Sequence, residues 1–239
     1  MTLLVLWDID RTLLYVGDID RRVYQETFEE VVGRPAENLP ARGTGVTMPL
    51  AIEGLLRDNG VSERDVPRMT TTMVHILPDR LAAHEDALRS QGILMPGARS
   101  ALEAVHDRDD MIPTVVTGNL QRSAALKLRA FQLDALVDME VGGYSSDNAH
   151  RPALVAVSQK RAQAKYGHSF SRTNTVIIGD SLEDVRTGLE GGAAVIGVAS
   201  GKTSSADLTE AGADAVLDDL TDTAGLLAAM DKVMMGTAR

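Results

Sequence analysis

Cysteine is absent from the 239-residue sequence, which excludes a disulfide framework and any chemistry that needs a thiolate. Its absence also fits a reducing compartment. Long apolar runs are missing as well: none approaches the length of a membrane span, and no charged leader precedes the first apolar segment. We therefore expect a cytoplasmic protein with no part embedded in a membrane.

Positive charge is scarce, because 24 lysines and arginines stand against 34 aspartates and glutamates and leave a formal net charge of −10. A chain with this balance is not expected to present a general surface for nucleic acid or anionic lipid. An anionic substrate would need local help from arginines or a bound cation. The length allows a sizeable core, either as one large domain or as a core with a smaller insertion.

Two aspartates, Asp8 and Asp10, stand at the end of the apolar run of residues 3–7 and are followed by Thr12. Side chains two positions apart in an extended segment point to the same face, so both carboxylates lie on one side of the strand's end. One carboxylate can then attack a substrate while the other handles a proton. The same pattern also occurs at solvated strand ends, so other segments must support this interpretation.

A second predicted strand, residues 111–116, ends in residues suited to a phosphate group. Thr117 offers a hydroxyl, and Gly118 and Asn119 offer backbone amides. A substrate phosphate is therefore expected at this strand end.

A third predicted strand, residues 175–178, is followed by Asp180 and then Asp184, at the start of a predicted helix. Carboxylate oxygens are the ligands that a hard ion such as magnesium prefers. Arg151 lies at another predicted helix start and offers a fixed cation for a nucleophile or a phosphate.

Strand and helix patterns alternate through most of the chain, which predicts an α/β fold with a Rossmann-like, doubly wound parallel sheet. The interval between the first strand and Met95 instead contains only helical patterns, and we interpret it as an inserted helical cap. Predicted helices there cover residues 21–32, 48–59 and 65–90. The predicted domains are a core of residues 1–14 and 96–239 and a cap of residues 15–95. The remaining predicted helices are 98–106, 121–131, 152–166, 182–190 and one from about 221, and the remaining strands are 194–198 and 215–217.

Four motifs occur together in a fixed order. They are Asp8-Ile9-Asp10-Arg11-Thr12, then Thr117-Gly118-Asn119, then the basic residue Arg151, and finally Gly179-Asp180-Ser181-Leu182-Glu183-Asp184. In this set the sequence resembles the haloacid dehalogenase-like (HAD) hydrolase superfamily, and specifically its phosphoglycolate-phosphatase-like branch with a helical cap. The resemblance extends over nearly the whole chain.

The resemblance implies that Asp8 is the nucleophile that becomes an aspartyl phosphate. It also implies that Asp10 protonates the leaving group and then activates water. A magnesium ion would be held by Asp8, the Asp10 backbone carbonyl and Asp180, with Asp184 acting directly or through water. The phosphoryl group would be bound by Thr117, Arg151 and the amides of Gly118 and Asn119. Metal and basic groups would offset charge on the phosphoryl oxygens.

The chain departs from the family pattern at two positions. Arg11 stands where the family normally has glycine, and the glycine's backbone freedom is lost if the conformation there is unusual. Arg11 would otherwise contact a substrate anion or point to solvent in an ordinary conformation. Arg151 replaces the more usual lysine and keeps its charge with a different shape. Further candidates for leaving-group contacts in the cap are Arg21, Arg22, Arg42 and Thr47.

The leading functional hypothesis is a magnesium-dependent phosphatase that acts on a small phosphorylated metabolite. A phosphomutase could use the same two aspartates, and the sequence separates the two poorly. A phosphate-binding protein with a weakened site is a third possibility, because Arg11 interrupts the nucleophile loop. A dehalogenase is disfavoured, because dehalogenases of this resemblance lack an aspartate at the position of Asp10. The sequence names no substrate, pathway or oligomeric state.

Overall fold

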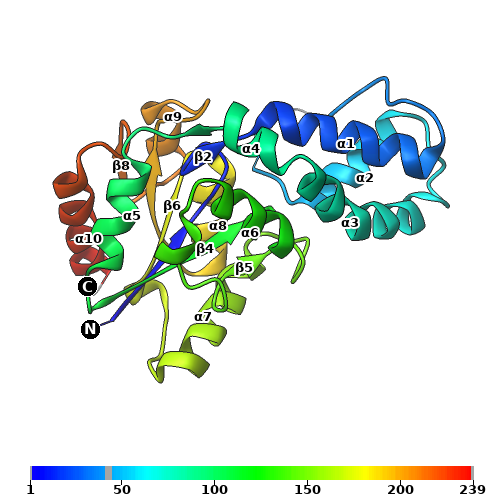
Figure 1. Ribbon diagram of the computed structural model, residues 1–239. Coiled ribbons are helices and arrows are strands. Elements are labelled where there is room, and N and C mark those ends of the chain that lie inside the picture. Colours follow the sequence, from blue (N-terminus) through cyan, green and yellow to red (C-terminus); the bar gives the residue numbers. More distant parts are fainter. Residues whose placement is uncertain (1, 41–44, 238–239) are drawn as a thin grey trace.

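The computed structural model describes residues 2–40 and 45–237, and within them the core is a six-stranded parallel sheet in the order β5-β4-β1-β6-β7-β8 (Figure 1). The strands of this sheet are β1 (Leu3–Trp7), β4 (Met111–Thr117), β5 (Gly143–Tyr144), β6 (Thr175–Gly179), β7 (Ala194–Val198) and β8 (Ala215–Leu217). The predicted α/β fold class is confirmed. In such a sheet all carboxyl ends of the strands meet at one edge, which is where ligands bind in open α/β proteins.

The central strand β1 explains why the apolar run is unbroken. Leu3, Val5 and Trp7 belong to the core on one face of the sheet, whereas Leu4 and Leu6 belong to the core on the other face. A strand that is buried on both faces needs apolar residues at every position. Residues of α5, α6 and α10 pack with the first face, and residues of α7 pack with the second. The core helices are α5 (Ala98–His106), α6 (Gln121–Ala130), α7 (Ala153–Tyr166), α8 (Leu182–Gly191), α9 (Ser205–Glu210) and α10 (Thr223–Thr237), with short 3₁₀ helices at η1 (Asp134–Leu136) and η2 (Arg172–Asn174).

The helical insertion begins and ends at a small ribbon, in which β2 (Leu14–Tyr15) pairs antiparallel with β3 (Ile93–Leu94). The helices between these strands form a group of their own beside the sheet (Figure 1). They are α1 (Gly17–Val32), α2 (Met48–Asp58), α3 (Val66–Ala83) and α4 (Glu85–Gln91). This arrangement supports the division at residues 15 and 95, which we keep as a proposal.

The predicted continuous helix over residues 65–90 is wrong, because the chain breaks at His84 between α3 and α4. The His84 ring nitrogen lies 2.8 Å from a Glu26 carboxylate oxygen of α1, so this residue is held by the neighbouring helix. A break of one residue leaves the helical periodicity almost unchanged, and the pattern could not reveal it. None of the described helices is both long enough and apolar enough to cross a lipid bilayer.

Candidate active site

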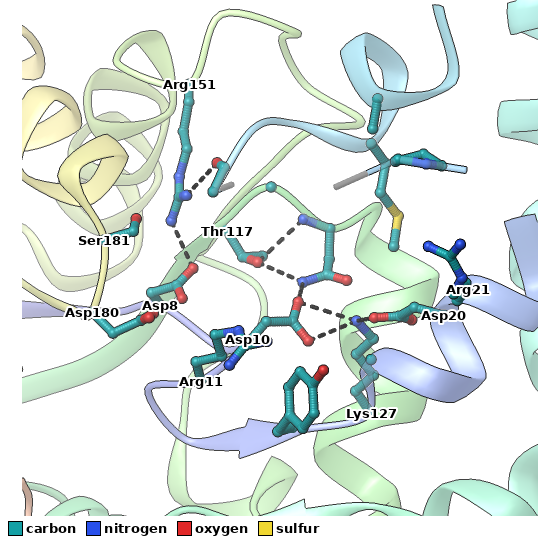
Figure 2. Close-up of a pocket in the computed structure, with 18 of the residues that line it drawn as sticks. Asp8, Asp10, Arg11, Asp20, Arg21, Thr117, Lys127, Arg151, Asp180 and Ser181 are labelled. Atoms are coloured by element: carbon teal, nitrogen blue, oxygen red, sulfur yellow. Dashed lines mark hydrogen bonds and ion pairs between the residues drawn. The ribbon is translucent and has the colours of Figure 1, made fainter. Parts of the chain in front are cut away.

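A pocket lies at the carboxyl ends of β1, β4 and β6, and the insertion contributes part of its wall (Figure 2). The core residues around it include Asp8, Asp10, Arg11, Thr117, Gly118, Asn119, Lys127, Arg151, Asp180 and Ser181. From the insertion come Tyr15, Gly17, Asp20, Arg21, Tyr24, Pro40, Gly45, Met48 and Ala51. The fold therefore brings the motif residues of distant segments to one place.

Asp8 lies at the end of β1 and is only 6% exposed. One carboxylate oxygen, Oδ1, accepts a hydrogen bond from Arg151 Nη2 at 2.6 Å, and Oδ2 faces the Thr12 hydroxyl at 3.4 Å. Burial raises the pKa of Asp8 well above its ordinary value, and the neighbouring Asp184 carboxylate raises it further, while Arg151 opposes both. A nearby cation is therefore needed to keep this buried carboxylate ionised.

Asp8, Asp180 and Asp184 form a buried acidic group in which one oxygen of each lies within 4.8 Å of the others. The start of α8 explains the position of Asp184. Ser181 caps this helix, and the Asp184 Oδ2 atom accepts hydrogen bonds from the Ser181 amide at 3.0 Å and hydroxyl at 2.6 Å. This reciprocal pattern is a capping box, and it holds the carboxylate at the strand end.

The acidic group suits a divalent cation. Burial raises the pKa of Asp180 to about 7, and repulsion from Asp184 adds to this effect. Arg151 contacts two of these three buried carboxylates, those of Asp8 and Asp184, and carboxylate oxygens are the donors that magnesium prefers. The donor set therefore fits the ion that the motifs predicted.

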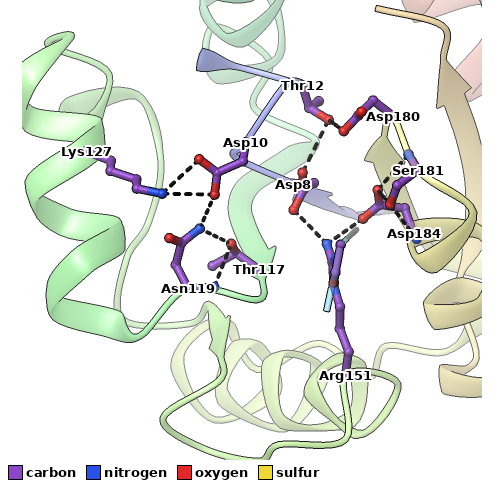
Figure 3. Close-up of polar contacts among 11 residues, drawn as sticks. Asp8, Asp10, Thr12, Thr117, Asn119, Lys127, Arg151, Asp180, Ser181 and Asp184 are labelled. Atoms are coloured by element: carbon purple, nitrogen blue, oxygen red, sulfur yellow. Dashed lines mark hydrogen bonds and ion pairs between the residues drawn. The ribbon is translucent and has the colours of Figure 1, made fainter. Parts of the chain in front are cut away.

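Arg151 is 2% exposed, and its guanidinium bridges several groups (Figure 3). Nη2 contacts both Asp8 and Asp184, and Nη1 donates to the Gly45 carbonyl of the insertion. Burial lowers the pKa of Arg151, but the two carboxylates outweigh this effect and hold the pKa above its usual range. Arg151 is therefore a permanent cation beside the predicted nucleophile, and it connects the insertion to the core.

The loop after β4 carries Thr117, Gly118 and Asn119. The Asn119 side-chain amide donates to Asp10 Oδ2 at 2.7 Å and to Thr117 Oγ1 at 2.8 Å, and the Asn119 backbone amide donates to the same hydroxyl at 3.2 Å. That backbone N–H was predicted to bind phosphate, but here it holds Thr117. Within the described residues the Thr117 hydroxyl proton has no acceptor, so it is available to a ligand.

Gly118 lies against the insertion. A Cβ atom at this position would lie 2.7 Å from the Val46 carbonyl oxygen, so only glycine allows the two backbones to approach this closely. The Gly118 carbonyl also accepts a hydrogen bond from the Met48 amide at 2.8 Å. The loop that should hold the phosphate is thus fixed against the start of α2.

The family model for haloacid dehalogenase-like hydrolases matches residues 5–188, which include all four motifs. The chain belongs to this family. A search of curated protein sequences finds no match.

Solved structures with the same fold include a hydrolase from Pseudomonas syringae with 22% sequence identity and a TM-score of 0.67, covering 95% of this chain and 98% of the other. A predicted phosphatase from Clostridium acetobutylicum has 16% identity and a TM-score of 0.69, with 95% and 99% of the two chains covered. A β-phosphoglucomutase from Clostridium difficile has 13% identity and a TM-score of 0.69, with 98% and 100% covered. These similarities confirm the HAD fold of both core and insertion.

Arg11, which replaces a glycine of the HAD pattern, has a left-handed backbone with φ of +69°. Its amide donates to the Leu14 carbonyl at 2.6 Å, and its carbonyl accepts from the Ser200 hydroxyl at 2.8 Å. The guanidinium lies over the Tyr15 ring, 4.2 Å from the ring centroid, and it lines the pocket. The interpretation of Arg11 as a solvent-directed residue in an ordinary conformation is therefore wrong.

The other cap candidates differ in their positions. Arg21 lines the pocket, whereas Arg22 is exposed on α1 and does not. Thr47 is buried, and its hydroxyl donates to the Ala149 carbonyl at 2.8 Å, so it fixes the insertion to a core loop. Arg42 lies outside the described residues.

Lys127 had no predicted role, yet it is fully buried beside Asp10. Its Nζ atom lies 2.8 Å from Asp10 Oδ1, 3.1 Å from Asp10 Oδ2 and 2.8 Å from Asp20 Oδ2. Burial lowers the pKa of Lys127, but the two carboxylates outweigh it and raise the pKa above its usual range. Its spacing in the sequence was the available signal of its burial. Lys127 lies three residues after Ala124 and four after Ser123, on the buried face of α6.

Proposed function

We propose that this HAD-family protein is a magnesium-dependent phosphatase that hydrolyses a phosphate monoester of a small metabolite through an aspartyl phosphate. The observation that carries the proposal is the convergence of Asp8, Asp10, Thr117 and Arg151 on one pocket beside the acidic group. The pocket then holds a nucleophile, an acid–base group, a hydrogen-bond donor to the phosphoryl oxygens and a cation, which are the groups that phosphoryl transfer needs.

In the first step, an Asp8 oxygen attacks phosphorus, the bond from phosphorus to the ester oxygen breaks, and Asp10 gives a proton to the departing oxygen. In the second step, Asp10 takes a proton from water as the water oxygen attacks the phosphoryl group and releases Asp8. Thr117 donates a hydrogen bond to a phosphoryl oxygen. Arg151 offsets negative charge at the reacting carboxylate.

Magnesium would be held by Asp8, Asp180 and the Asp10 backbone carbonyl, with Asp184 in support. When bound, the ion supplies positive charge that stabilises the phosphoryl oxygens in the transition state. Asp184 already accepts hydrogen bonds from Ser181 and Arg151, which favours a supporting role over a direct one.

The substrate side of the pocket combines Arg11 and Arg21 with Tyr15, Tyr24 and Met48. In a chain of net charge −10, two arginines at one pocket provide the local positive charge that an anionic metabolite needs. We therefore propose Arg11 and Arg21 as contacts for a second anionic group on the leaving part of the substrate.

The deciding experiment is turnover of a panel of phosphate esters, with added magnesium and after rigorous chelation. Magnesium-dependent release of inorganic phosphate supports the proposal, and no release from any ester contradicts it. A phosphomutase would use the same two aspartates, so the panel includes sugar monophosphates assayed for isomerisation with catalytic amounts of the sugar bisphosphate. If isomerisation were faster than phosphate release, the proposed function would be that of a phosphomutase and not that of a phosphatase.

A further inference from the structure

The side chain of Lys127 joins three parts of the structure. It comes from helix α6 of the core and contacts Asp10 after β1 (Figures 2 and 3) and Asp20 on helix α1 of the insertion (Figure 2). Lys127 is 1% exposed, whereas the Asp10 side chain is 35% exposed toward the pocket. A buried ammonium thus holds a carboxylate that is partly open to the substrate.

Both oxygens of Asp10 have partners. Oδ1 accepts from Lys127, and Oδ2 accepts from Asn119 at 2.7 Å and from Lys127 at 3.1 Å. Asn119 donates one hydrogen bond to Asp10, whereas Lys127 contacts both oxygens and carries charge. Charge-assisted contacts are the stronger kind, so the direction of the Asp10 carboxylate depends mainly on Lys127.

Asp20 holds the lysine from the opposite side. Its Oδ2 atom lies 2.8 Å from Lys127 Nζ, and its own side chain is 22% exposed. Without Asp20, the ammonium would keep, among the described residues, only its contacts with Asp10. Because Asp20 belongs to the first helix of the insertion, the position of that helix is coupled to the orientation of Asp10 through a single buried atom.

We propose that Lys127 is a positioning residue for the proton transfer by Asp10, and that Asp20 holds Lys127 in place from the insertion. This inference rests on the proposed phosphatase function and adds two residues to it. A misplacement of about 1 Å at a reacting group can cost about 10²-fold in rate. Loss of Lys127 should therefore act most strongly where the leaving group needs the proton.

Two esters of similar size separate this role from a structural one. Benzyl phosphate releases a strongly basic alkoxide and depends on protonation, whereas para-nitrophenyl phosphate releases a weakly basic phenolate and depends on it little. The measured quantity is kcat/KM, because it covers substrate binding through phosphoenzyme formation and excludes the later hydrolysis. For Lys127→Ala we expect kcat/KM to fall about 10²-fold with benzyl phosphate and far less with para-nitrophenyl phosphate.

Chemical rescue tests whether the missing ammonium causes the effect. Lys127→Ala removes the atoms of a propylamine molecule, and the site adjoins the pocket. Added propylamine should therefore restore activity with benzyl phosphate, whereas propanol of similar size should not. If Lys127→Ala does not fold, Asp20→Asn serves instead. It should also lower the ratio of kcat/KM for benzyl phosphate to kcat/KM for para-nitrophenyl phosphate, but by a smaller factor than Lys127→Ala.

A matched control is available in a second ion pair between the insertion and α6. Asp79 on α3 contacts Arg122 at 2.6 Å, both side chains are 64% exposed, and neither residue lines the pocket. Asp79→Asn should leave the ratio unchanged. The inference would be overturned if kcat/KM fell equally for both esters in the Lys127 and Asp20 variants, or if Asp79→Asn lowered the ratio as much as they do. The proposed phosphatase function would survive either result, because the wild-type protein would still be active. A wild-type protein inactive on every ester would instead overturn the proposed function and the inference together.

Discussion

Arg151 Nη2 lies 2.6 Å from Asp8 Oδ1, in a site where both side chains are almost fully buried. The same nitrogen also contacts Asp184, so one guanidinium fixes the predicted nucleophile relative to the acidic group. A lysine ammonium, the more usual group in the family, is a compact point charge and lacks the planar fork of donors. These contacts explain how an arginine can take the place of the usual lysine as the cation beside Asp8.

Asp8→Asn should abolish turnover while the protein remains folded, because an amide cannot form the acyl phosphate. Burial raises the pKa of Asp8, which means that the folded state disfavours its negative charge. The metal-free variant should therefore be at least as stable as the wild type at pH 8. Turnover, circular dichroism and thermal denaturation test these outcomes, and wild-type turnover by the verified variant would exclude covalent catalysis at Asp8.

Asp10→Asn should give a folded protein with slow phosphoenzyme formation and slow phosphoenzyme hydrolysis. General acid–base catalysis contributes about 10²–10⁴-fold, so each half-reaction should slow by a factor in that range when the leaving group is poor. Rapid-quench measurement of the two half-reactions tests this expectation. Unchanged rates in both would remove the acid–base role from Asp10.

The metal-free protein should lose stability as the pH rises from about 4 to about 7. Burial raises the pKa of Asp180 from its ordinary value of 3.8 to about 7, so across this interval the folded state keeps a proton that the unfolded chain releases. Each pKa unit of difference corresponds to about 1.4 kcal/mol in the free energy of unfolding. Denaturant titrations in chelator at several pH values measure the slope. In Asp180→Asn the slope should be shallower, and an identical slope would contradict the assignment.

Magnesium should be required for activity and should stabilise the protein, most clearly at pH 8, where protons no longer compete for Asp180. A ligand present at 100 times its dissociation constant raises the free energy of unfolding by about 2.7 kcal/mol. Asp180→Ala should lose most of this gain and much of the turnover. Full activity in rigorously metal-free buffer would defeat the metal-assisted mechanism.

Arg11→Gly should raise KM for an ester that carries a second anionic group far more than for an uncharged aryl phosphate. Loss of a uniform binding contact appears in KM and leaves kcat nearly unchanged. If the arginine instead strains the loop, kcat should rise with every ester. Identical kinetics for the variant and the wild type would remove both roles.

The stability of Arg11→Gly should differ little from that of the wild type. The left-handed backbone of Arg11 costs about 1–3 kcal/mol for a residue other than glycine, and the substitution relieves this cost. Loss of the contact with Tyr15, at about 0.5–1 kcal/mol, and the greater freedom of glycine in the unfolded chain act in the opposite direction. We therefore expect a net change within about 1 kcal/mol, measured by denaturant unfolding.

The core strands β1 and β7 were predictable because they are buried on both faces and form unbroken apolar runs, and both have the predicted bounds. The edge strand β8 also has the predicted bounds, although its three residues are only partly buried. The acidic and phosphate-binding motifs were predictable because parallel strands bring their ends to one edge. The ribbon of β2 and β3 could not be predicted, since two residues on each side carry no periodicity.

The roles of Lys127 and Arg11 were also hidden in the sequence, for different reasons. Lys127 stands 117 positions from Asp10, and its burial depends on Asp20 from the insertion. A lysine on a helix is ordinarily a solvated residue, and only tertiary structure shows otherwise. The left-handed conformation of Arg11 follows from its hydrogen bonds with Leu14 and Ser200, and side-chain identity alone does not encode it.

The paired ribbon of β2 and β3 makes the insertion separable from the chemistry. Leu14 pairs with Leu94 and Tyr15 with Ile93, so the two ends of the insertion lie side by side whatever the chain between them contains. An insertion of another length can therefore be joined at this ribbon without changing the path of the chain through the core. Exchanging residues 16–92 between relatives should therefore transplant substrate preference, provided that the incoming first helix presents an acidic residue where Asp20 meets the buried lysine.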